Sequence, residues 1–258
     1  MSPPEELASR VAALPRPLLI ALDVDGTLAP IVPDPASARV PDEVVAALRK
    51  IAAVPGVAVA IVTGRDAAQL ARMVELESAF RAVEHGRAVL APGEDESGEI
   101  DAAARARLER FRAIAAARFV PRGARIEEKR GAIVVHVREL AERDEDESRA
   151  ILREAARAAA DAGLFAREGR QVLEAQLAPA DKGAALLEIA RRTGAASVVY
   201  AGDDRTDEPA IALASARGIG VFVRSSERPD PPEGASAVVD GTGEVAAFLA
   251  ALAARLRT

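Results

Sequence analysis

The chain has 258 residues, enough for one large domain or two smaller ones, and half of them are hydrophobic, as in an ordinary globular protein. Its formal net charge of -6 argues against a nucleic-acid partner, because phosphate backbones select basic surfaces. It contains no cysteine, which excludes disulfide bridges and thiolate chemistry.

The start of the sequence, residues 1–16, lacks the charged beginning and apolar core of a signal peptide. No uninterrupted apolar run approaches the roughly 20 residues that a membrane span needs. We therefore expect a cytoplasmic protein without a membrane partner, and we expect it to be a monomer.

Short apolar runs alternate with helical patterns in the first and last parts of the chain. Strands are expected at Leu18–Leu22, Val57–Val62, 82–83, 197–201, 219–223 and 237–239, with helices at 41–53 and 66–76 in the first part. Continuous apolar strands alternating with helices predict an α/β fold, a doubly wound parallel sheet of Rossmann-like type that is covered on both faces.

The middle of the chain has a different pattern. It predicts a helix at 102–117, strands at 125–128, 132–138 and 171–174, a charged turn at 142–147 and a helix at 148–162. This order indicates a small α+β module inserted into the larger domain. We expect the core to comprise residues 1–103 and 178–258, and the inserted domain to comprise residues 104–177.

Two aspartates follow the first expected strand, in the sequence Asp23-Val24-Asp25-Gly26-Thr27. Strand periodicity would point both carboxylates to one side, where their like charges repel. A divalent cation would relieve that repulsion, and Gly26 would allow a sharp turn. By itself the pattern also fits a solvated turn, since Asp and Gly are common turn residues.

Thr63 and Asp203 follow other expected strands, and Lys182 lies just before the helix that precedes the strand ending at residue 201. In open α/β sheets ligands bind beyond the carboxyl ends of the strands, so these groups can converge. We expect Mg²⁺ at Asp23, Asp25 and Asp203, with a carbonyl oxygen and water among its ligands. The Thr63 hydroxyl and the Lys182 charge suit phosphate oxygens.

These segments, in this order, resemble the four motifs of the haloacid-dehalogenase-like phosphatases, and the inserted module resembles the cap domain of one subclass. Within that superfamily the chain is most similar to the trehalose-6-phosphate phosphatase family. The matching stretches are DVDGTLAP at 23–30, TGR at 63–65, EHG at 84–86, EEK at 127–129, HVR at 136–138, Glu174, DKG at 181–183 and GDDRTDE at 202–208.

The resemblance implies that Asp23 attacks phosphorus and becomes an aspartyl-phosphate, which splits one difficult displacement into two easier ones. Asp25 would protonate the leaving sugar oxygen and then take a proton from the attacking water. Asp207 would hold metal-bound water or Lys182, and Asp204 would share that role. The expected substrate is a small phosphosugar, trehalose 6-phosphate.

The resemblance also implies a set of sugar-binding side chains in the inserted domain. His136 either orients one of them, contacts the substrate, or is a partly buried strand histidine. Lys129 is either a sugar ligand or part of a solvated hairpin turn. Arg65 could reach phosphate or sugar, and His85 has a structural role. The full set that would contact the substrate is Arg65, Glu127, Lys129, His136, Arg138 and Glu174.

Gln176 and Leu177 stand where the family usually has an arginine–proline pair. The missing arginine removes a bidentate anchor and leaves the identity of the sugar open. The alternatives are a related capped phosphatase acting on sucrose phosphate or glycosyl-phosphoglycerate, and a non-catalytic phosphosugar-binding domain. A phosphorylated receiver domain would be roughly half this size and would lack the inserted module.

Overall fold

The computed structural model describes residues 2–94, 102–129, 131–177 and 179–256. The chain forms two compact units, one of residues 1–96 with 180–258 and the other of residues 97–179. The domain boundaries expected from the sequence stay a prediction. Among the described helices, none combines the length and the apolar character needed to cross a membrane.

The first unit is built on a seven-stranded sheet in the order β11–β10–β9–β1–β2–β3–β4. Neighbouring strands are parallel, except that β4 runs antiparallel to β3. The strands are β1 (Leu18–Leu22), β2 (Val57–Val62), β3 (Phe80–Val83), β4 (Ala88–Leu90), β9 (Ser197–Gly202), β10 (Gly218–Arg224) and β11 (Ala237–Asp240).

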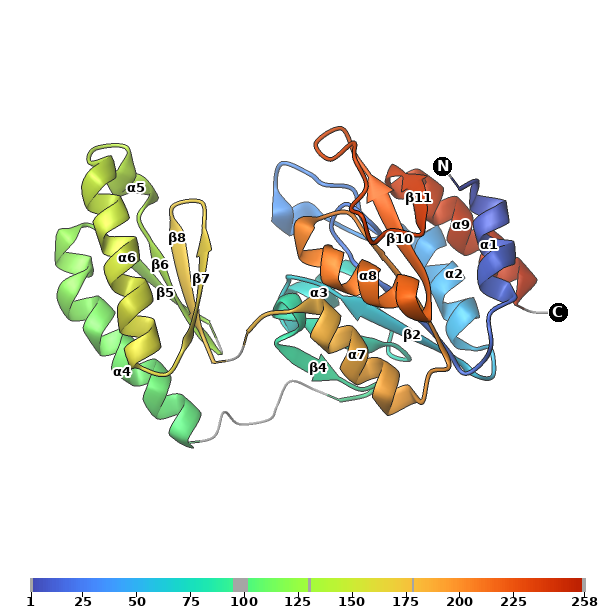
Figure 1. Cartoon of the computed structure of the whole chain (residues 1–258), viewed down its shortest axis with the longest axis horizontal. Helices are drawn as coiled ribbons and strands as arrows, with labels where there is room; N and C mark the ends of the chain where they lie inside the picture. The colour runs from blue at the N-terminus through green and yellow to red at the C-terminus, as the bar shows by residue number, and fades with distance from the viewer. Residues whose placement is uncertain (1, 95–101, 130, 178, 257–258) are drawn as a thin grey trace. The chain divides into compact units, whose positions relative to one another are not determined.

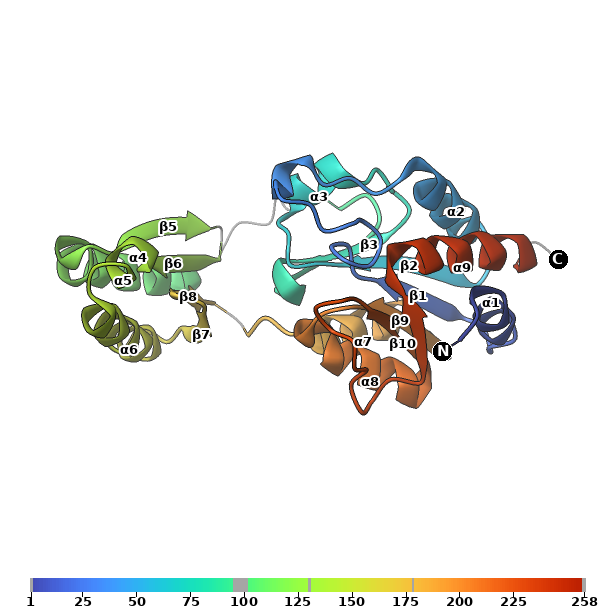
Figure 2. The same ribbon diagram turned by 90° about the horizontal axis from the view of Figure 1, so that it is seen from above.

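Helices cover both faces of this sheet, as Figures 1 and 2 show from two directions. Along β1, Leu18, Ile20 and Leu22 point into one apolar cluster, while Leu19 and Ala21 point into another on the opposite face. The first cluster packs against α1 (Pro4–Ala12), α2 (Asp42–Ala52), α3 (Ala67–Met73) and α9 (Gly241–Arg255), the second against α7 (Lys182–Thr193) and α8 (Glu208–Arg217). This confirms the expected doubly wound α/β sheet.

The second unit contains a four-stranded antiparallel sheet in the order β5–β6–β8–β7, with its helices on one face. Ile133, Val135 and Leu173 pack into an apolar cluster with Phe111 and Ile151 from the helices. The elements are α4 (Ala102–Arg118), β5 (Arg125–Lys129), β6 (Ala132–His136), α5 (Arg138–Ala141), α6 (Glu145–Asp161), β7 (Phe165–Gly169) and β8 (Val172–Gln176). The expected inserted α+β module is thereby confirmed.

Several details of the second unit differ from the expectation. The strand expected at 132–138 ends at His136, and Arg138 begins a short helix. The expected charged turn at 142–147 is partly helical, because Asp144 caps α6 by accepting a hydrogen bond from the Glu147 N–H. Strand β7 was not expected, since most of its side chains are exposed and give no apolar periodicity.

Four short 3₁₀ turns complete the described elements. They are η1 (Pro35–Ser37), η2 (Glu84–Gly86), η3 (Val120–Arg122) and η4 (Arg205–Asp207). Two of them carry residues of the motifs: η2 follows β3 directly, and η4 comes after β9 with Asp203 and Asp204 in between.

Candidate active site

Asp23 follows the fully buried strand β1 at the centre of the sheet, and it is only 4% exposed. Its N–H donates to the carbonyl of Ala201 on β9, so the backbone that carries the carboxylate is fixed by the sheet. Thr63 is placed in the same way after β2, with its N–H donating to the carbonyl of Ala82. Both motifs therefore lie at the carboxyl ends of adjacent central strands, as expected.

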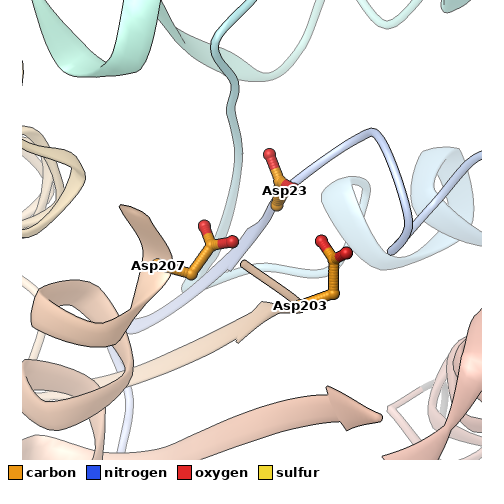
Figure 3. Close-up of side chains that lie close together, drawn as sticks. All are labelled: Asp23, Asp203 and Asp207. Carbon is orange, nitrogen blue, oxygen red and sulfur yellow. The ribbon is translucent and has the colours of Figure 1, made fainter. Parts of the chain in front are cut away.

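Three buried carboxylates come together at this end of the sheet. Asp23, Asp203 and Asp207 each offer one oxygen, and these oxygens all lie within 4.8 Å of one another (Figure 3). Asp203 directly follows β9, and Asp207 lies one short turn further along the chain. Of the expected metal ligands Asp23, Asp25 and Asp203, the structure brings the side chains of Asp23 and Asp203 together, and their binding of a metal stays a prediction.

Lys182 supplies the positive charge of the site. It is the first residue of α7, and the side chain of Asp181 caps that helix by accepting hydrogen bonds from the N–H groups of Gly183 and Ala184. The buried Lys182 ammonium donates to Asp23 Oδ1 at 2.8 Å and to Asp207 Oδ1 at 2.7 Å. Lys182 thus bridges the expected nucleophile and Asp207.

Asp207 is completely buried and is held by several donors. Besides Lys182, the hydroxyl of Tyr200 donates to Oδ1 at 2.5 Å, and the N–H of Asp204 donates to Oδ2 at 2.9 Å. Of the two roles that the resemblance implies for Asp207, the structure shows the contact with Lys182, and a role with metal-bound water stays a prediction. Tyr200 was missed, although the chain's single tyrosine stands on a buried strand just before the GDD motif.

Burial and neighbouring charges shift the pKa values of Asp23, Lys182 and Asp203. Burial raises the pKa of Asp23 well above its usual value, and although Lys182 opposes the rise, Asp207 adds to it. Burial by itself lowers the pKa of Lys182, but the carboxylates of Asp23 and Asp207 raise it overall, so the ammonium persists. Burial and then the charge of Asp207 raise the pKa of Asp203 to about 6.

The residues fit a divalent cation bound through oxygen. The Lys182 ammonium binds Asp23 and Asp207, whereas the buried Oδ1 of Asp203 has no hydrogen-bond partner within the described parts of the chain. Gly26 has a φ of +81°, and a Cβ at that position would lie 2.2 Å from Asp203 Oδ2. A glycine is therefore required here, both for the turn and for the close approach to Asp203.

Asp25 is engaged differently from Asp23. Both of its carboxylate oxygens accept hydrogen bonds from Arg65, from Nε at 2.9 Å and from Nη2 at 2.6 Å, and the side chain is not part of the three-carboxylate group. The expected contribution of Asp25 to a metal site stays a prediction. Arg65 also donates to the carbonyl of Pro35, so its guanidinium anchors Asp25 and the loop before α2.

The turn η2 holds the TGR segment, residues 63–65, through backbone hydrogen bonds. The N–H of Glu84 donates to the carbonyl of Arg65, and the N–H of His85 donates to the carbonyl of Thr63. Glu84 and His85 both have positive φ, 52° and 58°, a backbone strain that the surrounding hydrogen bonds hold in place. A Cβ at Gly64 would lie 2.5 Å from the His85 ring, which agrees with the expected structural role of His85.

Asp204 takes part in the site through its backbone. Its N–H donates to Asp207, and its carboxylate accepts a hydrogen bond from the Thr206 hydroxyl at 3.2 Å. Its side chain therefore caps η4 and does not join the carboxylate group. The role of Asp204 near a metal stays a prediction.

The expected sugar ligands of the inserted domain lie in the second unit, four of them on the sheet face opposite α4 and α6. Lys129 Nζ lies 3.4 Å from Glu174 Oε1, and His136 Nε2 lies 2.8 Å from Glu127 Oε2. Arg138 lines a cavity of about 380 Å³ together with His136 and other residues of that sheet end. Four of the expected sugar ligands therefore form two pairs with one another, and the role of all five in binding a sugar stays a prediction.

Comparisons with known proteins identify the relatives of this chain. The family model described as trehalose-phosphatase matches residues 21–241. A trehalose-phosphate phosphatase of Mycobacterium marinum is 34% identical over 256 residues, which are 95% of this chain and 63% of the relative. An uncharacterised glycosyl hydrolase of Mycobacterium tuberculosis is 36% identical over 251 residues, which are 92% of this chain and 18% of the relative.

The chain therefore spans less than two thirds of the length of these curated relatives. Among solved structures, an Aspergillus fumigatus trehalose-6-phosphate phosphatase has a TM-score of 0.70 and 25% identity, and the match covers 97% of both chains. The resemblance drawn from the motifs is confirmed: this chain belongs to the trehalose-phosphatase family.

Proposed function

We propose that this chain hydrolyses trehalose 6-phosphate to trehalose and inorganic phosphate, with Mg²⁺ as cofactor and Asp23 as nucleophile. One observation carries the proposal: Asp23, Asp203 and Asp207 converge with Lys182 in a buried group at the carboxyl ends of the central strands. A buried excess of negative charge is costly unless a cation is bound there. The family membership supports the same activity.

In this proposal Asp23 attacks the phosphorus and carries the phosphoryl group as an aspartyl-phosphate. Lys182, which already donates to Asp23, offers its charge to the phosphoryl oxygens, and the Thr63 hydroxyl donates to another. Asp25 delivers a proton to the leaving sugar oxygen and later accepts one from water. Arg65 holds both oxygens of the Asp25 carboxylate in this arrangement, so Asp25 would have to release Arg65 and take up a proton before it could serve the leaving oxygen.

Asp23 and Asp203 would hold the magnesium ion, and the carbonyl of Asp25 is a further candidate ligand. When bound, the ion would neutralise the charge that otherwise repels a phosphate ester from three carboxylates. Asp207 and Asp204 would keep this end of the site ordered. The second unit would bind the sugar through Glu127, Lys129, His136, Arg138 and Glu174.

A panel of phosphosugars tests the substrate, with released phosphate measured in Mg²⁺ and in EDTA. Trehalose 6-phosphate is expected to give the highest kcat/KM, EDTA is expected to abolish turnover, and Asp23→Asn is expected to be inactive while remaining folded. Turnover of another sugar phosphate without turnover of trehalose 6-phosphate would contradict the assigned substrate. Binding of the sugar without phosphate release would favour a non-catalytic domain.

A second candidate is a related sugar phosphatase acting on sucrose phosphate or glycosyl-phosphoglycerate. The observation that favours it is the end of β8, where a buried Gln176 stands in place of the arginine that the family usually has as a bidentate anchor. Both compounds belong in the same panel, and the ranking of their kcat/KM values decides between the two candidates.

A further inference from the structure

Tyr200 lies in the middle of β9, between its neighbours β1 and β10, and none of its surface is exposed. Its ring packs in the apolar cluster beneath α7 and α8, with Leu186, Ile189 and Ile211 among the neighbours. Its hydroxyl donates to Asp207 Oδ1 at 2.5 Å. Burial and then the charge of Asp207 raise the pKa of Tyr200, so this hydroxyl stays a donor.

The hydroxyl of Tyr200 and the ammonium of Lys182 bind the same oxygen of Asp207. The second oxygen of Asp207 accepts the N–H of Asp204 at 2.9 Å. Hydrogen bonds therefore fix both oxygens of Asp207. Because the neutral Tyr200 hydroxyl also donates to Oδ1, the negative charge of Asp207 is not directed at the Lys182 ammonium only. Without that donor, the ammonium would be drawn toward Asp207 and away from Asp23.

We propose that Tyr200 is a positioning residue for phosphoryl transfer: its hydroxyl fixes Asp207, and Asp207 in turn sets where the Lys182 ammonium stands between Asp23 and the incoming phosphate. This inference rests on the proposed phosphatase function. Tyr200 does not touch the reacting atoms in this arrangement. It acts on them through the hydrogen-bonded sequence Tyr200–Asp207–Lys182–Asp23.

The alternative is a purely structural role, in which Tyr200 is a core residue whose hydroxyl only supplies a hydrogen bond to a buried carboxylate. The two possibilities differ in kinetics. A positioning role predicts that Tyr200→Phe lowers kcat by about threefold to tenfold, the net worth of one hydrogen bond, with little change in KM. A core role predicts a loss of stability with no change in kcat.

The kinetic test uses p-nitrophenyl phosphate with Mg²⁺ and compares wild type, Tyr200→Phe and Ile189→Val. Ile189 is fully buried in the same cluster, and its shortening lowers stability without touching Asp207. The expected result is a lowered kcat for Tyr200→Phe alone. A wild-type kcat in Tyr200→Phe, or an equal loss in Ile189→Val, would overturn the inference.

A second measurement separates this inference from the phosphatase function itself. The chain has only three lysines, Lys50, Lys129 and Lys182, so NMR of the labelled ammonium groups gives signals that single variants can assign. Tyr200→Phe is expected to shift the Lys182 signal and to leave the Lys50 and Lys129 signals in place. An unmoved Lys182 signal would overturn the positioning role, whether or not the wild type releases phosphate. A wild type without turnover contradicts the proposed function only.

Discussion

Asp203 shows at the scale of one residue how the site works against stability. Its pKa is raised from 3.8 to about 6 by burial and by Asp207, so the folded protein holds this proton more tightly than the unfolded chain does. A group of this kind favours folding while it is protonated. The stabilisation that protonated Asp203 adds to the free energy of unfolding is therefore complete below about pH 4, and it is lost as the pH rises through about 6.

We expect Asp203→Asn to stabilise the metal-free protein at about pH 7.5 by about 1–2 kcal/mol, because the variant removes a buried charge. At about pH 4 the gain should disappear. Urea denaturation in EDTA at the two pH values measures this, with the exposed Asp230→Asn as control. A variant that is less stable than wild type at neutral pH would show that the Asp203 carboxylate is already compensated within the protein.

At the scale of elements, the tight turn after β1 brings the chain against Asp203. Gly26→Ala forces a Cβ to within 2.2 Å of Asp203 Oδ2 at a φ of +81°. We expect this variant to weaken Mg²⁺ binding and phosphate release together by about 10-fold or more. Titration calorimetry with Mg²⁺ and a phosphate-release assay measure both.

Gly243 is the matched control for this substitution. It lies in α9, and a Cβ there meets nothing within 4 Å. Gly243→Ala is expected to leave activity and Mg²⁺ affinity unchanged and to stabilise the helix by about 0.5 kcal/mol. If Gly26→Ala also kept wild-type Mg²⁺ affinity, the turn would not be part of the metal site.

The strands that end at the site could be predicted from the sequence. β1 and β2 have the expected bounds, and β9 is one residue longer than expected. These strands were predictable because each is a mostly apolar run that ends where polar motif residues begin. Strand β7 could not be predicted, because it is an edge strand with mostly exposed side chains. Local pattern therefore identifies buried strands and misses edges whose pairing depends on the rest of the fold.

The sequence predicts where the site residues lie better than it predicts which side chains they contact. The convergence of Asp23 and Asp203 follows from the strand ends, and Lys182 joins them from the start of α7. The contacts of Asp207 with Tyr200 and of Arg65 with Asp25 join residues on different elements, and only the packed fold brings them together. A tyrosine on a buried strand looks like a core residue until its hydroxyl partner is known.

At the scale of the whole molecule, the proposed chemistry is divided between the two units. Carboxylates and Lys182 of the first unit would act on the phosphoryl group, and side chains of the second unit would act on the sugar. The two contributions should therefore be separable by the choice of substrate. A variant of the second unit should discriminate between a sugar phosphate and a small ester.

We expect Lys129→Ala to lower kcat/KM for trehalose 6-phosphate by about 10-fold or more, because it removes a charged donor to the sugar hydroxyls. The same variant should change kcat/KM for p-nitrophenyl phosphate less than about twofold. Lys50→Ala, an exposed lysine of the first unit, is the control. Equal losses on both substrates would show that Lys129 is not a sugar-specific contact.

Trapping the covalent intermediate tests the nucleophile most directly. The protein is quenched in acid during incubation with substrate and reduced with borohydride, which converts an aspartyl-phosphate to homoserine. Peptide mass spectrometry then locates the converted residue. The expected result is homoserine at Asp23 in wild type and none in Asp23→Asn. Homoserine at another aspartate, or turnover with none at all, would contradict Asp23 as the residue that receives the phosphoryl group.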